Sequence, residues 1–194
     1  MKFKKQNLEQ SAMILMFSTL IAKVIGACFK IPLASDTFLG DLGFGYFSVA
    51  HDLFMPFYVL AISGLPAAVS HITAEFVAQK RFLDVKKSFG LTRKLFVFFG
   101  VLVSLLISLI AVPIVLLTDN SGNTMYSIIA VVPSIFLMFL ISVYRGYFEG
   151  FCNMYPTAIS KLIEALGKLV LGLLISFVVI KLTNNPALSA AGAM

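Results

Sequence analysis

The sequence predicts an all-α fold: a polytopic membrane helix bundle with five transmembrane helices and the start of a sixth. Of the 194 residues, 59% are hydrophobic and 12% are charged, about half the charged share of an average soluble domain. The apolar residues form continuous runs and lack the alternation that is typical of outer-membrane barrel strands. Composition and pattern together therefore favour helices that cross a membrane.

Each expected helix is an apolar run bounded by polar or turn-forming residues. The first contains two lysines, the second is interrupted by Pro56, Gly64 and Pro66, and the third has no charged residue. Charged residues mark the end of the fourth run and the beginning of the fifth, and small residues open the sixth. The expected helices are approximately 11–34, 45–78, 95–117, 125–148, 156–180 and 187–194.

The sixth run is much shorter than the about twenty residues that a membrane span needs. We therefore interpret residues 1–194 as a partial transmembrane domain, the N-terminal lobe of a longer protein. The remaining C-terminal helices of that protein are an expected partner of this lobe.

Basic residues gather in alternate connections between the apolar runs. They lie in the N-terminal tail and in an expected loop at 79–94, whereas the connections after the first and third runs carry acidic residues and no base. This alternation predicts a cytoplasmic N-terminus and a cytoplasmic 79–94 loop. The net charge of +6 is thus explained by membrane orientation, and we expect no nucleic-acid partner.

Lys23 and Lys30 lie inside the first apolar run, seven residues apart. Seven residues are nearly two helical turns, so both side chains share one face of the helix. A charge near the bilayer centre costs roughly 2.5–3.5 kcal/mol on insertion scales. The pair therefore predicts a water-filled or anionic environment, and both lysines are candidate substrate-binding residues.

The second run carries two further candidate features. His51 and Asp52 could form a proton or cation relay, or they could lie at the outer interface as hydrogen-bonded side chains. Gly64 and Pro66 could form a hinge, because proline removes one helical hydrogen bond and broken helices recur in transporters. A packing kink is the alternative for this second feature.

A charged cluster is expected where the fourth run ends and the fifth begins. Arg145 and Glu149 are four residues apart, as are Glu164 and Lys168, and this spacing allows local ion pairs on a helix. We interpret the four residues as a cytoplasmic charge network that could act as a latch or gate. Plain anchoring at the membrane interface remains the alternative.

No pattern in the sequence indicates catalysis or metal binding. It contains no GxSxG motif, no P-loop and no HExxH spacing, so we expect no enzyme activity, no metal and no organic cofactor. Cys28 and Cys152 are far apart, and we expect them to be buried free thiols.

Four segments together resemble a known family. Residues 144–160 read YRGYFEGFCNMYPTAIS, and residues 64–70 and 23–30 read GLPAAVS and KVIGACFK. With the closing AGAM at 191–194, they resemble the stage V sporulation protein B-like polysaccharide biosynthesis proteins. These belong to the multidrug/oligosaccharidyl-lipid/polysaccharide exporter superfamily, as do the lipid II flippases.

The resemblance implies two pseudo-symmetric lobes around a central cavity and transport by alternating access. The implied substrate is a lipid-linked oligosaccharide or peptidoglycan precursor used for the cell envelope or in sporulation. By position, Lys23 and Lys30 would engage the diphosphate of this substrate. Transport could be coupled to the membrane potential or to a Na⁺ or H⁺ gradient, and membrane lipids of a bacterial plasma membrane would surround the protein.

Two other functions stay open at this point. A cation-coupled exporter of drugs or other small molecules from the same superfamily would use His51 and Asp52 as its ion site. A non-transporting scaffold, or a fragment without activity, would use none of the candidate residues.

Overall fold

The structure, a computed structural model, describes residues 8–35, 39–118, 123–183 and 185–194. Within these ranges the chain is helical and contains no strand. Two of the elements, η1 and η2, are single π-helical turns inside longer helices. The order is α1 (Leu8–Leu33), α2 (Gly40–Val59), η1 (Leu60–Gly64), α3 (Leu65–Ala78), α4 (Phe82–Thr118), α5 (Thr124–Gly150), α6 (Tyr155–Gly167), η2 (Lys168–Gly172), α7 (Leu173–Thr183) and α8 (Pro186–Gly192).

Five of these helical stretches are long and apolar enough to cross a membrane, which confirms the predicted all-α bundle. They are Glu9–Leu33, Gly40–Ala78, Phe82–Pro113, Thr124–Gly150 and Tyr155–Thr183. The sixth expected element is α8, whose first turn is capped by the Asn185 side chain, which accepts a hydrogen bond of 3.0 Å from the backbone N–H of Ala187. An asparagine cap followed by proline is a strong helix start.

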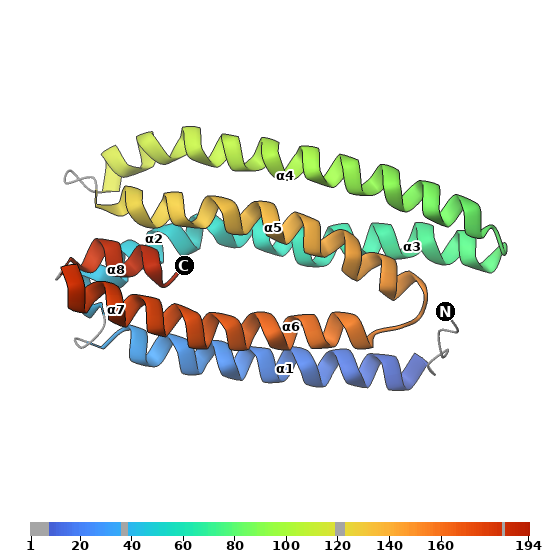
Figure 1. The fold of residues 1–194 in the computed structure, drawn as a ribbon, viewed down its shortest axis with the longest axis horizontal. Helices are drawn as coiled ribbons and strands as arrows, with labels where there is room; N and C mark the ends of the chain where they lie inside the picture. The colour runs from blue at the N-terminus through green and yellow to red at the C-terminus, as the bar shows by residue number, and fades with distance from the viewer. Residues whose placement is uncertain (1–7, 36–38, 119–122, 184) are drawn as a thin grey trace.

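The long helices form two groups (Figure 1). In one group α5 packs against α4 and against the continuous helix α2–η1–α3, and in the other α1 packs against α6 and η2. The two groups meet through α8, which contacts α7, α5 and α2, and through a smaller contact between α5 and α6 near their connection. Side chains of α1 and α6 also reach the other group, since Phe29 contacts Phe47 of α2 and Glu164 contacts Arg145 of α5.

The helix α5 is the centre of the larger group. Its buried side chains, which include Ile128, Ile135 and Phe139, pack with Ala50 of α2 and Ile107 of α4 in one apolar cluster. A second cluster joins Phe29 of α1 to Phe47 of α2 and to the small residues of α8. These two clusters hold α1, α2 and α5, which carry several of the candidate site residues.

Small residues let α5 approach α3 closely. Ser142, Gly146 and Gly150 recur every four residues on one face of α5, the spacing of close helix contacts in membranes. A Cβ atom added at Gly146 would lie only 2.6 Å from the carbonyl oxygen of Pro66. The Ser142 hydroxyl also donates a hydrogen bond to the carbonyl of Ala61, so this face fixes the position of both halves of the second span.

The expected loop at 79–94 is wrong, because α4 already begins at Phe82. With 37 residues, α4 is roughly 55 Å long at 1.5 Å per residue, well beyond the about 30 Å of hydrocarbon. Its first turns carry bases on the outside, but Val85 is buried and Phe89 packs on the rings of Tyr144 and Tyr147. This apolar stripe explains why the basic segment is helical.

Candidate functional site

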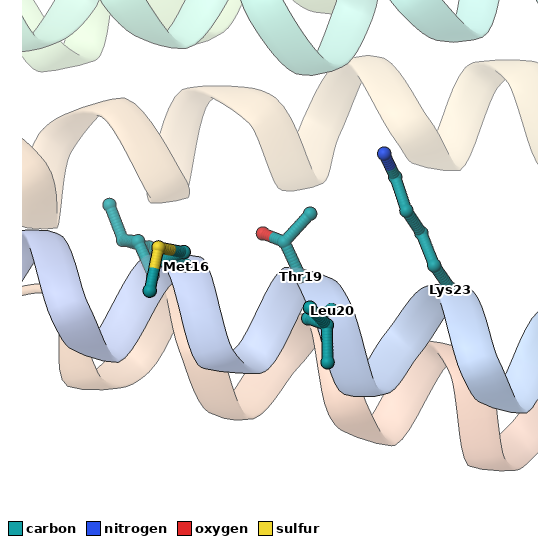
Figure 2. A pocket seen from close by; sticks show the side chains of 5 residues that line it. Met16, Thr19, Leu20 and Lys23 are labelled. Carbon is teal, nitrogen blue, oxygen red and sulfur yellow. The ribbon is translucent and has the colours of Figure 1, made fainter.

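The two lysines of the first span lie on α1 and are both exposed. A groove of about 410 Å³ runs along α1 beside Leu15, Met16, Thr19, Leu20 and Lys23. Figure 2 shows Thr19 and Lys23 projecting from the same side of the helix, toward the neighbouring ribbon, whereas Leu20 lies on the opposite side. Lys30 follows in the last turn of α1.

Two more lysines meet these from the other side of the α1–α6 contact. The ammonium group of Lys161 donates a hydrogen bond of 3.3 Å to the hydroxyl of Thr19, one helical turn from Lys23. The ammonium group of Lys168 lies 5.5 Å from the ring centre of Phe29 and 5.9 Å from that of Phe47. It also lies close enough to Lys30 for the two charges to repel each other.

Lysines from α1 and from the α6–η2 helix thus form one basic face, which comprises Lys23, Lys30, Lys161 and Lys168. The sequence predicts substrate binding for the first pair only and places Lys168 in the charge network instead. A signal for the second pair was present, because Lys161 and Lys168 are seven residues apart, the same spacing as Lys23 and Lys30. Only the contact between the helices shows that Lys161 reaches Thr19 of α1 and that Lys168 lies near Lys30.

His51 and Asp52 lie next to this basic face on α2. The imidazole stacks on Phe47 with ring centres 5.7 Å apart, and its side chain is 15% exposed, whereas that of Asp52 is 84% exposed. The His51 Nδ1 and Asp52 Oδ1 atoms are 3.8 Å apart, which is too long for a hydrogen bond. The imidazole is therefore fixed by packing, and the carboxylate is free to meet an ion or solvent.

Arg145 is the centre of the predicted charge network. Its guanidinium is 4% exposed; Nη2 donates to Glu164 Oε2 and Nε donates to Ser160 Oγ, both at 2.8 Å. The other carboxylate oxygen of Glu164 accepts a hydrogen bond of 3.5 Å from the hydroxyl of Tyr58. Three spans are therefore joined at one point: α5 by Arg145, α6 by Glu164 and α2 by Tyr58.

The remaining two members of the predicted network lie differently from the local pairs that the spacing suggested. Glu149 lies within electrostatic range of both Arg145 and Lys161. Lys168 lies over Phe29 and Phe47 on the basic face, while its expected partner Glu164 points to Arg145.

The predicted hinge is a π-helical turn in an otherwise continuous helix. Gly64 is the last residue of η1, with helical φ and ψ of −71° and −49°, and Pro66 follows inside the continuous helix, where it has no N–H for an intrahelical hydrogen bond. Single π turns often mark functional sites. Pro66 is buried against Gly146 of α5, so any bending here has to move with α5.

The two cysteines are free, but the expectation that they are buried is wrong, since both are exposed. Apolar neighbours in the sequence do not decide burial: Cys28 lies on an exposed face of α1, and Cys152 lies in the turn after α5 with a φ of 55°. Among the residues that the structure describes, no three His, Cys, Asp or Glu side chains are grouped as a metal site.

The fold and the site define a class: a polytopic helical membrane protein whose charged side chains lie at the contacts between its spans. The model of the polysaccharide biosynthesis protein family matches residues 8–194, and the chain belongs to this family. This membership confirms the resemblance of the motifs at 23–30, 64–70 and 144–160.

Three curated relatives are from Bacillus subtilis (strain 168). The chain is 30% identical to stage V sporulation protein B over 98% of this chain and 36% of that protein. It is 24% identical to the lipid II flippase MurJ over 96% of this chain and 35% of that protein. It is 28% identical to the uncharacterized membrane protein YabM over 98% of this chain and 34% of that protein. The chain thus spans about a third of the length of these relatives, and no solved structure matches it.

Proposed function

We propose that this chain is the N-terminal part of a flippase that moves a lipid-linked saccharide or peptidoglycan precursor across the membrane by alternating access. Membership of the polysaccharide biosynthesis family supports a role in making cell-envelope polysaccharide, and one relative is named a lipid II flippase. The remaining helices of the longer protein would supply the second wall of the substrate cavity.

The basic face carries this proposal. Like charges on Lys30 and Lys168 repel each other, and the repulsion is strong where water is scarce. A diphosphate brings several negative charges and would turn this repulsion into attraction. Lys161 donates a hydrogen bond to Thr19, and Lys23 lies one helical turn after Thr19 in the same groove. Both ammonium groups can therefore offer further donors to the same anion. Lysines act as mobile point charges here, which suits a ligand that must also be released.

Replacing the lysines by glutamine in the full-length protein tests the proposal. We expect Lys23→Gln/Lys30→Gln and Lys161→Gln/Lys168→Gln each to lower translocation of a lipid-linked precursor into the outer leaflet of proteoliposomes by at least tenfold, since a hydrogen bond to a charged group contributes about 1.5–3 kcal/mol. Lys181→Gln, at the exposed end of α7, is the matched control and should leave the rate unchanged. Wild-type rates in both double variants would contradict the proposal.

We further propose that Asp52, with His51 beside it, takes part in coupling transport to an ion gradient. The support is the carboxylate itself, which is 84% exposed within a membrane span and lies 3.8 Å from the His51 imidazole. A charge in such a span is unfavourable unless it has a functional partner. We expect Asp52→Asn to abolish the stimulation of precursor transport by an imposed Na⁺ or H⁺ gradient while binding of the precursor persists. Gradient-driven export of dyes that depends on Asp52, with no effect on the precursor, would instead support a small-molecule exporter.

The basic connection between α3 and α4 suggests the orientation. The start of α1, the turn from α3 to α4 and the turn from α5 to α6 lie at the same end of the bundle (Figure 1). Since positive residues favour the cytoplasmic side, we propose that this end is cytoplasmic and that the membrane is a bacterial plasma membrane.

A further inference from the structure

A second cavity, of about 260 Å³, lies where α5 turns into α6. Its walls are mostly apolar or aromatic and include Ile141, Tyr144 and Phe148 of α5 and Pro156 of α6. None of its lining residues belongs to the groove along α1. The proposed transport of a precursor along the basic face therefore leaves this cavity without a role.

One strong hydrogen-bond donor of the cavity has no partner. Arg145 lines the cavity, and its side chain is 4% exposed. Two of its nitrogens are bonded to Ser160 and Glu164, but buried Nη1 has no hydrogen-bond partner among the residues that the structure describes. A buried donor of this kind is rarely left unpaired in proteins, because its desolvation is not compensated. Because Nη1 is sealed from solvent, an acceptor oxygen in the cavity reaches it only after the surrounding side chains shift.

The beginning of α6 makes the same cavity favourable for an anion. Pro156 and Thr157, both in the first turn of α6, form part of its wall. The first turn of a helix carries a partial positive charge from its free N–H groups, and phosphate groups bind at such ends. Helix end and guanidinium therefore both favour a phosphate oxygen over a neutral group.

The position of the cavity favours a lipid as the source of that phosphate. Arg145 lies five residues before Gly150, the last residue of α5, which is about 7–8 Å along the helix axis and near the level of the lipid headgroups. Basic pockets between spans at this depth bind the phosphate groups of lipids, and Tyr and other aromatic residues are enriched there. We propose that the cavity between α5 and α6 binds the phosphate of an anionic phospholipid on Arg145, with the lipid chains along the apolar wall.

The expected binding is selective but not tight. Arg145 and Lys161 lie within electrostatic range of Glu149 and Glu164, so the local charges nearly balance before a lipid binds. The preference for phosphate then rests on one guanidinium nitrogen and the helix end. We expect a preference of about tenfold over a lipid of the same chains without phosphate.

Native mass spectrometry of the full-length protein in detergent tests this proposal. The probes are phosphatidylglycerol, a diglucosyl diacylglycerol with the same acyl chains, and inorganic phosphate. We expect the wild type to retain phosphatidylglycerol about tenfold more tightly than the phosphate-free lipid. Ile141→Trp, which fills the cavity, and Arg145→Gln/Glu164→Gln, which removes the charge without leaving a buried carboxylate, should both lose this preference. Ile163→Trp is the matched control, because Ile163 is 64% exposed and lies outside the cavity.

Several results would overturn the proposal. Equal retention of the two lipids by the wild type would mean that water alone meets Nη1. A preference that persists in Ile141→Trp would place the lipid elsewhere, even if the double variant failed to fold. Displacement of phosphatidylglycerol by an equal concentration of inorganic phosphate would identify a free ion as the ligand. None of these measurements depends on transport, so they stand apart from the test of the basic face.

Discussion

Gly146→Ala is expected to lower the free energy of unfolding of the full-length protein by about 2–3 kcal/mol, and Gly146→Leu is expected to prevent folding. The added Cβ would lie 2.6 Å from the carbonyl oxygen of Pro66 and 2.7 Å from Cβ of Val69. Backbone atoms cannot rotate out of the way, so α3 has to move off α5. Overpacking of this kind costs about 1–3 kcal/mol in well-packed sites.

Thermal unfolding in detergent, followed by the loss of helical circular dichroism, measures this effect. Gly26→Ala and Gly167→Ala are matched controls, since an added Cβ at either position would meet no atom of the described residues within 4 Å. Gly64→Ala should also fold normally, because its nearest contact would be 3.9 Å away at a terminal carbon of Leu60. If Gly146→Ala were as stable as these variants, the close contact between α3 and α5 would not exist in the membrane protein.

Glu164→Ala is expected to destabilise the protein by about 3–5 kcal/mol, because it leaves the guanidinium of Arg145 buried without its carboxylate. The same change also removes the acceptor of the Tyr58 hydroxyl. Arg145→Gln/Glu164→Gln should recover most of this loss, since amides can keep hydrogen bonds without a buried net charge. The double variant therefore separates the penalty of an unpaired charge from the value of the ion pair.

A second ion pair of the chain gives the control. Arg81 and Asp84 approach to 2.7 Å, but their side chains are 57% and 32% exposed, and exposed pairs contribute only about 0–1 kcal/mol. Asp84→Ala should therefore shift the midpoint of thermal unfolding much less than Glu164→Ala. Equal shifts would mean that water reaches Arg145 and that the three spans are not joined there.

The number and approximate positions of the five spans could be predicted because each of the first five apolar runs is long enough to cross the hydrocarbon layer. The third span shows where this reasoning stops. Hydropathy marks the part of α4 that lies in hydrocarbon, but the first turns from Phe82 are helical for another reason, the packing of Val85 and Phe89 on one face. In the sequence, these two apolar residues stand among more numerous basic residues, and the segment therefore resembles a polar loop.

The candidate site could be predicted only in part, since spacing along a helix is local and ion-pair partners need not be. Arg145 has Glu149 four residues away, but it pairs with Glu164, nineteen residues away on the next span. Glu164 in turn has Lys168 within electrostatic range on its own helix, but its hydrogen bonds go to Arg145 and Tyr58. Local pairing rules apply to isolated helices, whereas a buried guanidinium takes the partner that the helix contact brings to it.

The π-helical turns η1 and η2 affect how this chain should be aligned with other members of its family. A π turn closes its hydrogen bond over five residues where an α-helix uses four, so it accommodates one additional residue without ending the helix. A relative with an ordinary α-helix at Leu60–Gly64 or Lys168–Gly172 should therefore align with a one-residue gap in the middle of a span. An alignment that forbids gaps inside spans would match lysine at position 168 with a residue of the neighbouring helix face, and the basic face would seem to be missing in that relative.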